Sequence, residues 1–227
     1  MTSSESPLAL RLARCLPGAS FELEALTRLI GIEETTSVPT ASVTCRGRAR
    51  LLVNPEFVAT YCRRDEHLFL LVMHELWHVL MGHTTLYPRL TGAHNIAFDA
   101  IINAGLARQH PEAAFRGFFE AINPADTFPA LLLRPPVGWP HAPNRRLAGP
   151  AGTNEIMRRL YPRSSTSRTE PTYDELLALI NRGSPRTPAT APVLIGNHAS
   201  DDGSPLDDEL FGDVIRKIVA GWPPPPI

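Results

Sequence analysis

The sequence predicts an α+β domain that is mainly helical, with a small sheet beside one buried helix. Two segments, 65–82 and 95–107, are apolar almost all round, which is typical of helices in the interior of a domain. A third segment, 40–53, has the pattern of two short strands joined by a turn. With 227 residues, 43% of them hydrophobic, the chain is long enough to bury a core around these elements.

The first part of the chain is expected to contain a helix and a hairpin. Residues 19–30 place their apolar side chains near helical spacing and predict a helix. Segment 40–53 predicts two strands, at 42–44 and 49–53, with the turn between them. The pair Asn54-Pro55 is expected to end the second strand, because proline cannot donate to a sheet.

Segment 65–82 (DEHLFLLVMHELWHVLMG) is the strongest helix prediction in the chain. Asp65 suits the N-cap, and Gly82 suits the C-terminal stop. A second buried helix is expected over 95–107 (NIAFDAIINAGLA).

Proline is unevenly distributed, with 5 of the 23 prolines in residues 1–110 and 18 in residues 111–227. Because proline blocks helix interiors, the second half is expected to consist of short elements and loops. We expect a Pro-rich connection over about 122–150, short helices at 153–160 and 172–181, a turn-rich loop at 196–206 and an amphipathic helix at about 207–221. The connection is either a lid over a cleft or a plain linker. A single domain is expected over residues 1–222, followed by a Pro-rich tail at 223–227.

Composition argues against several classes of protein. A formal net charge of -1 offers no broad basic surface to nucleic acid. The three cysteines are widely spaced and include no CxxC pair, which suits reduced thiols in the cytosol. Arg11 and Arg14 interrupt the N-terminal apolar stretch, and no run reaches the roughly 18 apolar residues of a membrane span. The sequence therefore predicts a cytoplasmic protein with neither nucleic acid nor membrane as partner.

His74, Glu75 and His78 form an HExxH pattern on the predicted buried helix. Positions i and i+4 share one helix face, so both imidazoles can bind one zinc ion. Glu75 is turned by roughly 100° from His74, which places its carboxylate beside the metal as a catalytic base. HExxH also occurs by chance, as solvated side chains on polar helices. Here the flanks are apolar, and burying two imidazoles and a carboxylate is costly without a partner such as a metal.

A catalytic zinc takes three protein ligands and keeps one position open. Asp99 is the preferred third ligand, and His83 is the alternative. Asn95 and Asn103 lie one turn either side of Asp99 and are candidate orienting partners. The competing interpretation has Asn95 capping the helix and Asp99 paired with an arginine. His83 follows His78 by five residues and would point roughly 140° away from it on a continued helix.

The sequences HELWHVLMGH and NIAFDAIIN together resemble the bacterial family of HExxH metallopeptidase domains that is often found N-terminal to a von Willebrand A-like domain. The upstream TASVTCRGRARLLVNPEFV and the later NHASDDG loop extend the similarity loosely over most of the chain. The layout is also similar to thermolysin-like zincins, with Asp99 in place of a glutamate ligand. The resemblance implies a zincin-like fold and a zinc metallopeptidase activity. The von Willebrand A-like domain of longer members is expected to be missing here.

Two functions from different classes are consistent with these residues. In the preferred one, a zinc metallopeptidase hydrolyses a peptide or protein substrate through water activated by Glu75. In the alternative, a catalytically silent zincin-fold module binds a partner protein, such as an ATPase or a von Willebrand A-like protein encoded separately. Glu75 favours catalysis, because a structural zinc prefers four protein ligands and has no use for a non-ligating carboxylate. Hydrolysis of a non-peptide amide is a third hypothesis.

Other polar residues are weaker candidates. Tyr87, His94 and His141 can assist a transition state as donors, but packed or solvated loop side chains are the stronger interpretation. His198, Asp201 and Asp202 are compatible with a second metal, yet a turn at Gly203 explains them equally well.

Overall fold

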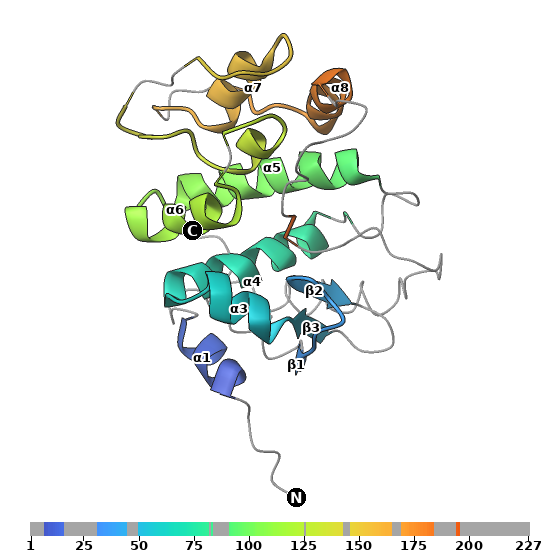
Figure 1. The fold of residues 1–227 in the computed structure, drawn as a ribbon, viewed down its shortest axis with the longest axis vertical. Coiled ribbons are helices and arrows are strands. Elements are labelled where there is room, and N and C mark those ends of the chain that lie inside the picture. The colour runs from blue at the N-terminus through green and yellow to red at the C-terminus, as the bar shows by residue number, and fades with distance from the viewer. Residues whose placement is uncertain are drawn as a thin grey trace, which may run out of the picture. The chain divides into compact units, whose positions relative to one another are not determined.

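The computed structural model describes residues 7–15, 31–44, 50–81, 83, 91–124, 126–142, 146–164, 169–183 and 194–195. Its elements are α1 (Pro7–Cys15), β1 (Gly31–Glu34), β2 (Ala41–Thr44), β3 (Arg50–Val53), α3 (Pro55–Tyr61), α4 (Asp65–Leu80), α5 (Gly92–Gln109), α6 (Ala113–Ile122), the 3-10 helix η1 (Ala130–Leu133), α7 (Thr153–Leu160) and α8 (Tyr173–Gly183) (Figure 1). The expected α+β class, mainly helical with a small sheet, is confirmed.

By their contacts, the described residues divide into two units, one up to His83 and the other from Thr91 to Ile195. Each unit has its own buried side chains and is described separately below. The single domain expected over residues 1–222 stays a prediction.

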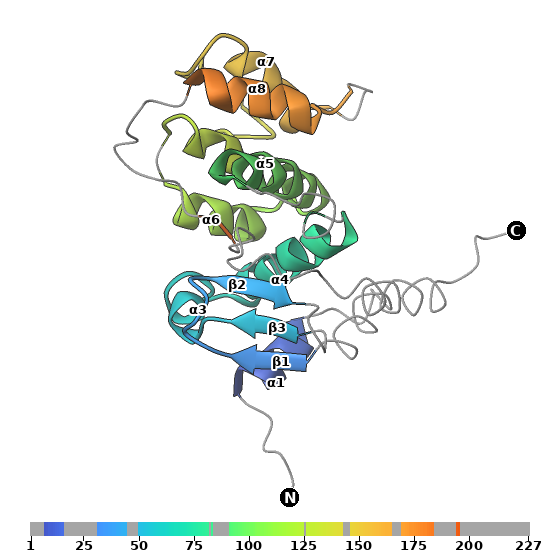
Figure 2. The same cartoon turned by 90° about the vertical axis from the view of Figure 1, so that its right-hand side faces the viewer.

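The first unit contains a three-stranded sheet with the order β1-β3-β2, visible as three adjacent arrows in Figure 2. β3 pairs antiparallel with β2, with Ala41 opposite Val53, and parallel with β1. The expected hairpin strands are therefore confirmed. β1 (GIEE) was not predicted, because a four-residue strand with two glutamates has no apolar alternation to reveal it. Val43 and Leu51 are buried, and β2 contacts α4.

Asn54 joins the sheet to α3. Its side-chain oxygen accepts hydrogen bonds from the backbone N–H groups of Glu56 and Phe57 at 2.9 and 3.4 Å. Its Nδ2 donates to the carbonyl of Val38 at 2.9 Å. Pro55 takes the first helical position, where its missing N–H costs nothing. The predicted end of the strand is confirmed, whereas the seven-residue helix after it is too short to have shown a periodicity.

Helix α4 confirms the predicted buried helix of the first unit. Its fully buried side chains include Leu68, Leu70, Leu71, Val72 and Leu76. The N-cap assignment of Asp65 is wrong, because the helix already begins at this residue. Its carboxylate instead accepts a hydrogen bond from Arg11 Nε of α1 at 2.8 Å. α4 ends at Leu80, and Gly82 lies outside the described residues.

Helix α5 is the core of the second unit and contacts α6, η1, α7 and α8. In both ribbon views it runs between α6 on one side and α7 with α8 on the other (Figures 1 and 2). It begins earlier than the predicted 95–107, because Thr91 and His94 form a capping box. The Thr91 hydroxyl accepts from the His94 N–H at 3.4 Å, and His94 Nδ1 accepts from the Thr91 N–H at 3.3 Å. Asn95 therefore lies inside the helix and does not cap it.

Much of the Pro-rich connection at 122–150 is core and not exposed linker. The four residues of η1 are buried against α5. Arg134 and Trp139 are also buried, and the Trp139 indole donates to the carbonyl of Pro162 at 3.1 Å. These contacts argue against a lid built from residues 130–139. The predicted helices at 153–160 and 172–181 are confirmed as α7 and α8, and α6 was not predicted.

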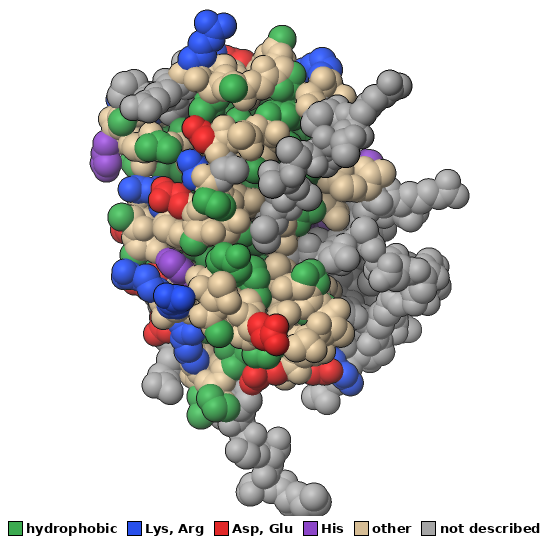
Figure 3. Space-filling model, in the orientation of Figure 1, with side chains coloured by type: hydrophobic (Ala, Val, Ile, Leu, Met, Phe, Trp, Pro, Cys, Tyr) green, Lys and Arg blue, Asp and Glu red, His purple; other side chains and the backbone are tan. Residues whose placement is uncertain are grey.

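Several expected elements lie outside the described residues: the helix at 19–30, the loop at 196–206, the helix at 207–221 and the tail at 223–227. Among the described helices, none is long and apolar enough to cross a membrane. Acidic and basic side chains are interspersed over the described part of the face in Figure 3, in keeping with the formal net charge of -1.

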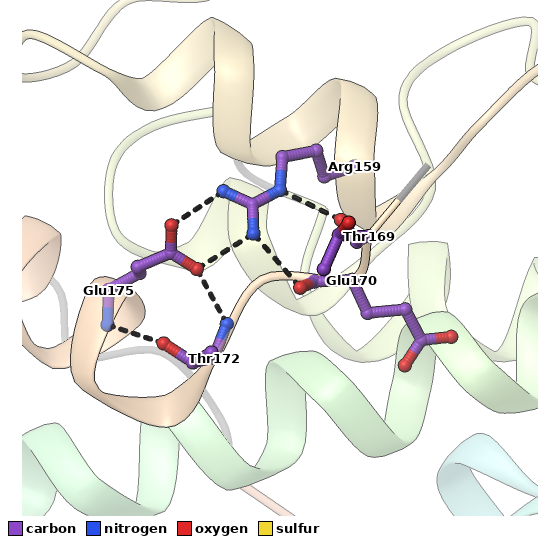
Figure 4. A network of polar contacts seen from close by, with 5 residues as sticks. All are labelled: Arg159, Thr169, Glu170, Thr172 and Glu175. Atoms are coloured by element: carbon purple, nitrogen blue, oxygen red, sulfur yellow. Dashed lines mark hydrogen bonds and ion pairs between the residues drawn. The ribbon is translucent and has the colours of Figure 1, made fainter. Parts of the chain in front are cut away.

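A charged network around Arg159 joins α7 to α8 (Figure 4). Its two terminal nitrogens each donate to one oxygen of Glu175 at 2.7 Å, a bidentate geometry. The same guanidinium donates to the carbonyls of Thr169 and Glu170, both at 2.9 Å. Glu175 also forms a capping box with Thr172 at the start of α8. The bonds from Arg159, and then the backbone bond from Thr172, lower the pKa of Glu175 from its ordinary 4.5 to about 2.

The substitution Arg159→Met is expected to raise the pKa of Glu175 from about 2 part of the way toward 4.5, measured by carboxyl NMR. A carboxyl whose pKa is lowered by folding stabilises the fold above its unfolded pKa, and loses that effect as the pH falls through the folded pKa. The variant should therefore be less stable than the wild type at pH 7, with the difference vanishing between about pH 4.5 and 2. Arg158→Met, which removes an exposed pair with Glu155 and a hydrogen bond to the carbonyl of Asn154 but no contact to Glu175, is the matched control. An unmoved Glu175 pKa in Arg159→Met would contradict the assignment.

The substitution Asn54→Ala is expected to lower the free energy of unfolding by about 1–2 kcal/mol, because it removes the cap of α3. Asn54→Asp keeps the capping oxygen and loses the donor to the carbonyls of Val38 and Pro39, so its loss should be smaller. Urea denaturation of both variants measures the difference. Equal losses would show that the bonds from the Asn54 amide to Val38 and Pro39, and not the cap, stabilise this junction.

Candidate metal centre

His74 and His78 face each other from successive turns of α4. The spacing of four residues brings the two rings to one helix face, and both side chains are fully buried. Their Nε2 atoms lie 2.9 Å apart, and the ring centroids lie 4.7 Å apart. Two imidazole nitrogens that converge on one point can supply two of the ligands of a metal ion.

His83 folds back onto the last turn of the same helix. Its backbone N–H donates to the carbonyl of His78 at 3.1 Å, five residues earlier, which is the bond of a Schellman-type helix end. Its Nδ1 lies 3.1 Å from Nδ1 of His78. The structure therefore brings the His83 ring to His78. The contact is made with Nδ1 of His78, whereas Nε2 of His78 faces His74. The 140° separation expected on a continued helix does not apply, because the helix ends at Leu80.

Asp99 lies in the middle of α5 and is 1% exposed. Its Oδ2 accepts a hydrogen bond from the backbone N–H of Ile195 at 3.2 Å. Asn95 and Asn103, one turn either side, are buried as well. The Asn103 amide donates to the carbonyl of Leu133 in η1 at 3.0 Å. The predicted polar stripe on an apolar helix is present, and the orienting role of the two asparagines stays a prediction.

His74, His78 and Asp99 form a group that can hold a metal ion. Each offers one ligand atom, all three side chains are buried, and these atoms lie within 4.8 Å of one another. Bonds of about 2.1 Å to a tetrahedral metal hold ligand atoms roughly 3.4 Å apart, so the group has a suitable size. Two imidazoles and a carboxylate suit several divalent transition metals. No other such group of three or more occurs among the described residues.

Glu75 is fully buried and lies between the two histidines in the sequence of α4. It is not a member of the three-residue group. The role of catalytic base that the HExxH pattern predicts for Glu75 stays a prediction.

The residues that were weaker candidates for the site either make other contacts or lie outside the described residues. His94 takes part in the capping box of α5. His141 is exposed, and its backbone carbonyl accepts from Arg163 at 3.3 Å. Tyr87, His198, Asp201 and Asp202 lie outside the described residues. Sequence analysis missed the bond from Ile195 to Asp99, because a backbone donor 96 residues away has no sequence pattern.

No family model, curated protein or solved structure matches this chain. The resemblance to HExxH metallopeptidase domains therefore rests on the motifs alone.

We expect the purified protein to bind about one divalent transition-metal ion per chain, measured by elemental analysis without chelator. The substitutions His74→Ala, His78→Ala and Asp99→Ala should each remove most of the bound metal, because each deletes one of three ligands. His67→Ala is the matched control, since His67 lies on α4 outside the group and its Nδ1 contacts the carbonyl of Tyr61. An unchanged metal content in the three ligand variants would contradict the assignment.

Proposed function

We propose that this chain is a zinc-dependent metallopeptidase with a zincin-like fold. The observation that carries the proposal is the buried group of His74, His78 and Asp99, with Glu75 next to it in the sequence. A set of two imidazoles and one carboxylate leaves one position of a tetrahedral zinc for water or substrate, as hydrolytic zinc sites require. The motif resemblance to HExxH metallopeptidase domains supports the same conclusion.

In this proposal each residue has a separate task. His74, His78 and Asp99 would hold the metal, and the backbone N–H of Ile195 orients the Asp99 carboxylate. When bound, zinc supplies Lewis acidity that lowers the pKa of water and polarises a carbonyl. Glu75 takes the proton of the attacking water and delivers it to the departing amine nitrogen of the cleaved peptide bond.

A specific observation supports the second candidate function, a catalytically silent module that binds a partner protein. His74, Glu75 and His78 are all fully buried. A hydrolytic centre must admit both water and substrate, whereas a metal that only stabilises a fold need not. An ATPase or a von Willebrand A-like protein encoded separately would then be the partner.

The substitution Glu75→Gln separates the two functions. It is nearly isosteric, so metal content and the free energy of unfolding should stay close to wild type. Loss of the general base should lower the rate of peptide hydrolysis by about 100-fold or more, measured on a mixed peptide library. Glu66→Gln on the same helix is the matched control, because Glu66 pairs with Arg64 and lies outside the group.

The outcomes are distinct. Hydrolysis by Glu75→Gln at the wild-type rate would show that Glu75 is not the base. A zinc-loaded wild type that cleaves nothing in the library would support the silent module instead. A wild type that binds no zinc would exclude both functions.

A further inference from the structure

We propose that His83 is a positioning residue for the candidate ligand His78. Its ring holds His78 in the tautomer that carries the proton on Nδ1 and leaves Nε2 for the metal. This inference rests on the proposed metal centre, and it assigns to His83 a role other than that of an alternative ligand.

The two nitrogens of the His78 ring have different neighbours. Nε2 lies 2.9 Å from Nε2 of His74, and Nδ1 lies 3.1 Å from Nδ1 of His83. The rings of His78 and His83 meet edge to face, with an interplanar angle of 72°. One side of the His78 ring is thus directed to the metal group and the other to His83.

Tautomer chemistry links these two contacts. A nitrogen that binds a metal is unprotonated, so a neutral His78 bound through Nε2 carries its hydrogen on Nδ1. That Nδ1–H needs an acceptor, and Nδ1 of His83 lies at hydrogen-bond distance. His83 then carries its own hydrogen on Nε2. In the reverse arrangement, with His83 as the donor, the His78 proton would sit on Nε2 and block the metal.

The backbone holds His83 in place independently of its ring. The bond from the His83 N–H to the His78 carbonyl, at 3.1 Å, ties the residue to the last turn of α4. The side chains of both histidines are fully buried. Removing the ring by substitution leaves the backbone bond intact, so the role of the ring can be tested by itself.

The position of His83 argues against direct ligation. The described group that can hold a metal contains His74, His78 and Asp99, and His83 is not a member. Metal-binding histidines commonly give their second N–H to a partner that fixes the ring, and removal of such partners weakens metal affinity. The partner is often a carboxylate or a carbonyl, and here it is a second imidazole.

The test compares the zinc affinity of His83→Ala, His83→Leu and His83→Asn with wild type, by competition with a chelator of known affinity. Ala and Leu should weaken zinc binding by about 10- to 100-fold, because the acceptor for the His78 proton is lost. Asn should restore most of the affinity, since its side-chain oxygen stands as many bonds from the backbone as Nδ1 of histidine does. His67→Ala should bind zinc as the wild type does.

A second readout does not depend on any variant folding. Nitrogen-15 NMR of zinc-loaded wild type should show His78 protonated on Nδ1 and His83 protonated on Nε2. Wild-type affinity in His83→Ala, no rescue by Asn, or a His83 protonated on Nδ1 would each overturn the inference while leaving the metal centre intact. If the wild type binds no zinc, the proposed function fails and the inference fails with it.

Discussion

The cost of burying ionisable side chains inside apolar helices is the constraint on which the rest of this structure depends. His74, Glu75, His78 and Asp99 are each at most 1% exposed. An imidazole or carboxylate in such surroundings is destabilised by several kcal/mol unless hydrogen bonds, an opposite charge or a metal compensate for the lost water. The bonds from Ile195 to Asp99 and between His78 and His83 are part of that compensation. A metal ion shared by His74, His78 and Asp99 would add to that compensation.

The ends of the two buried helices are as important to this arrangement as their apolar faces. α4 ends at Leu80, and the bond from the His83 N–H to the His78 carbonyl closes its last turn. That same turn presents the His83 ring to His78. α5 begins with the capping box of Thr91 and His94, which starts the helix early enough to make Asn95 a helical, buried residue. Local helix-end chemistry therefore decides which polar side chains point into the core.

The sequence was sufficient for features that depend on local periodicity. It predicted α4, α5, the β2–β3 pair, the shared helix face of His74 and His78, and the polar stripe through Asp99. It failed where the deciding partner is distant or lies on the backbone. Nothing near Asp99 in the sequence reveals the amide of Ile195, and a Thr-His capping box is a rarer pattern than one ending in Glu or Gln. The 140° for His83 applied only to a continued helix; the helix ends at Leu80, near the stop expected at Gly82, and the bond from the His83 N–H to the His78 carbonyl folds the residue back.

The two candidate functions use the same metal ligands. They differ in the number of protein ligands that the metal needs and in whether water and substrate must reach it. A purely structural zinc would be expected to take four protein ligands, yet the described group has three. Among the described residues, the imidazole of His83 contacts Nδ1 of His78 and is not a member of the group. A set of three ligands leaves one position of a tetrahedral metal for water, which the proposed hydrolase requires. The proposed hydrolase requires the open position that three ligands leave, whereas the full burial of Glu75 is compatible with the silent module.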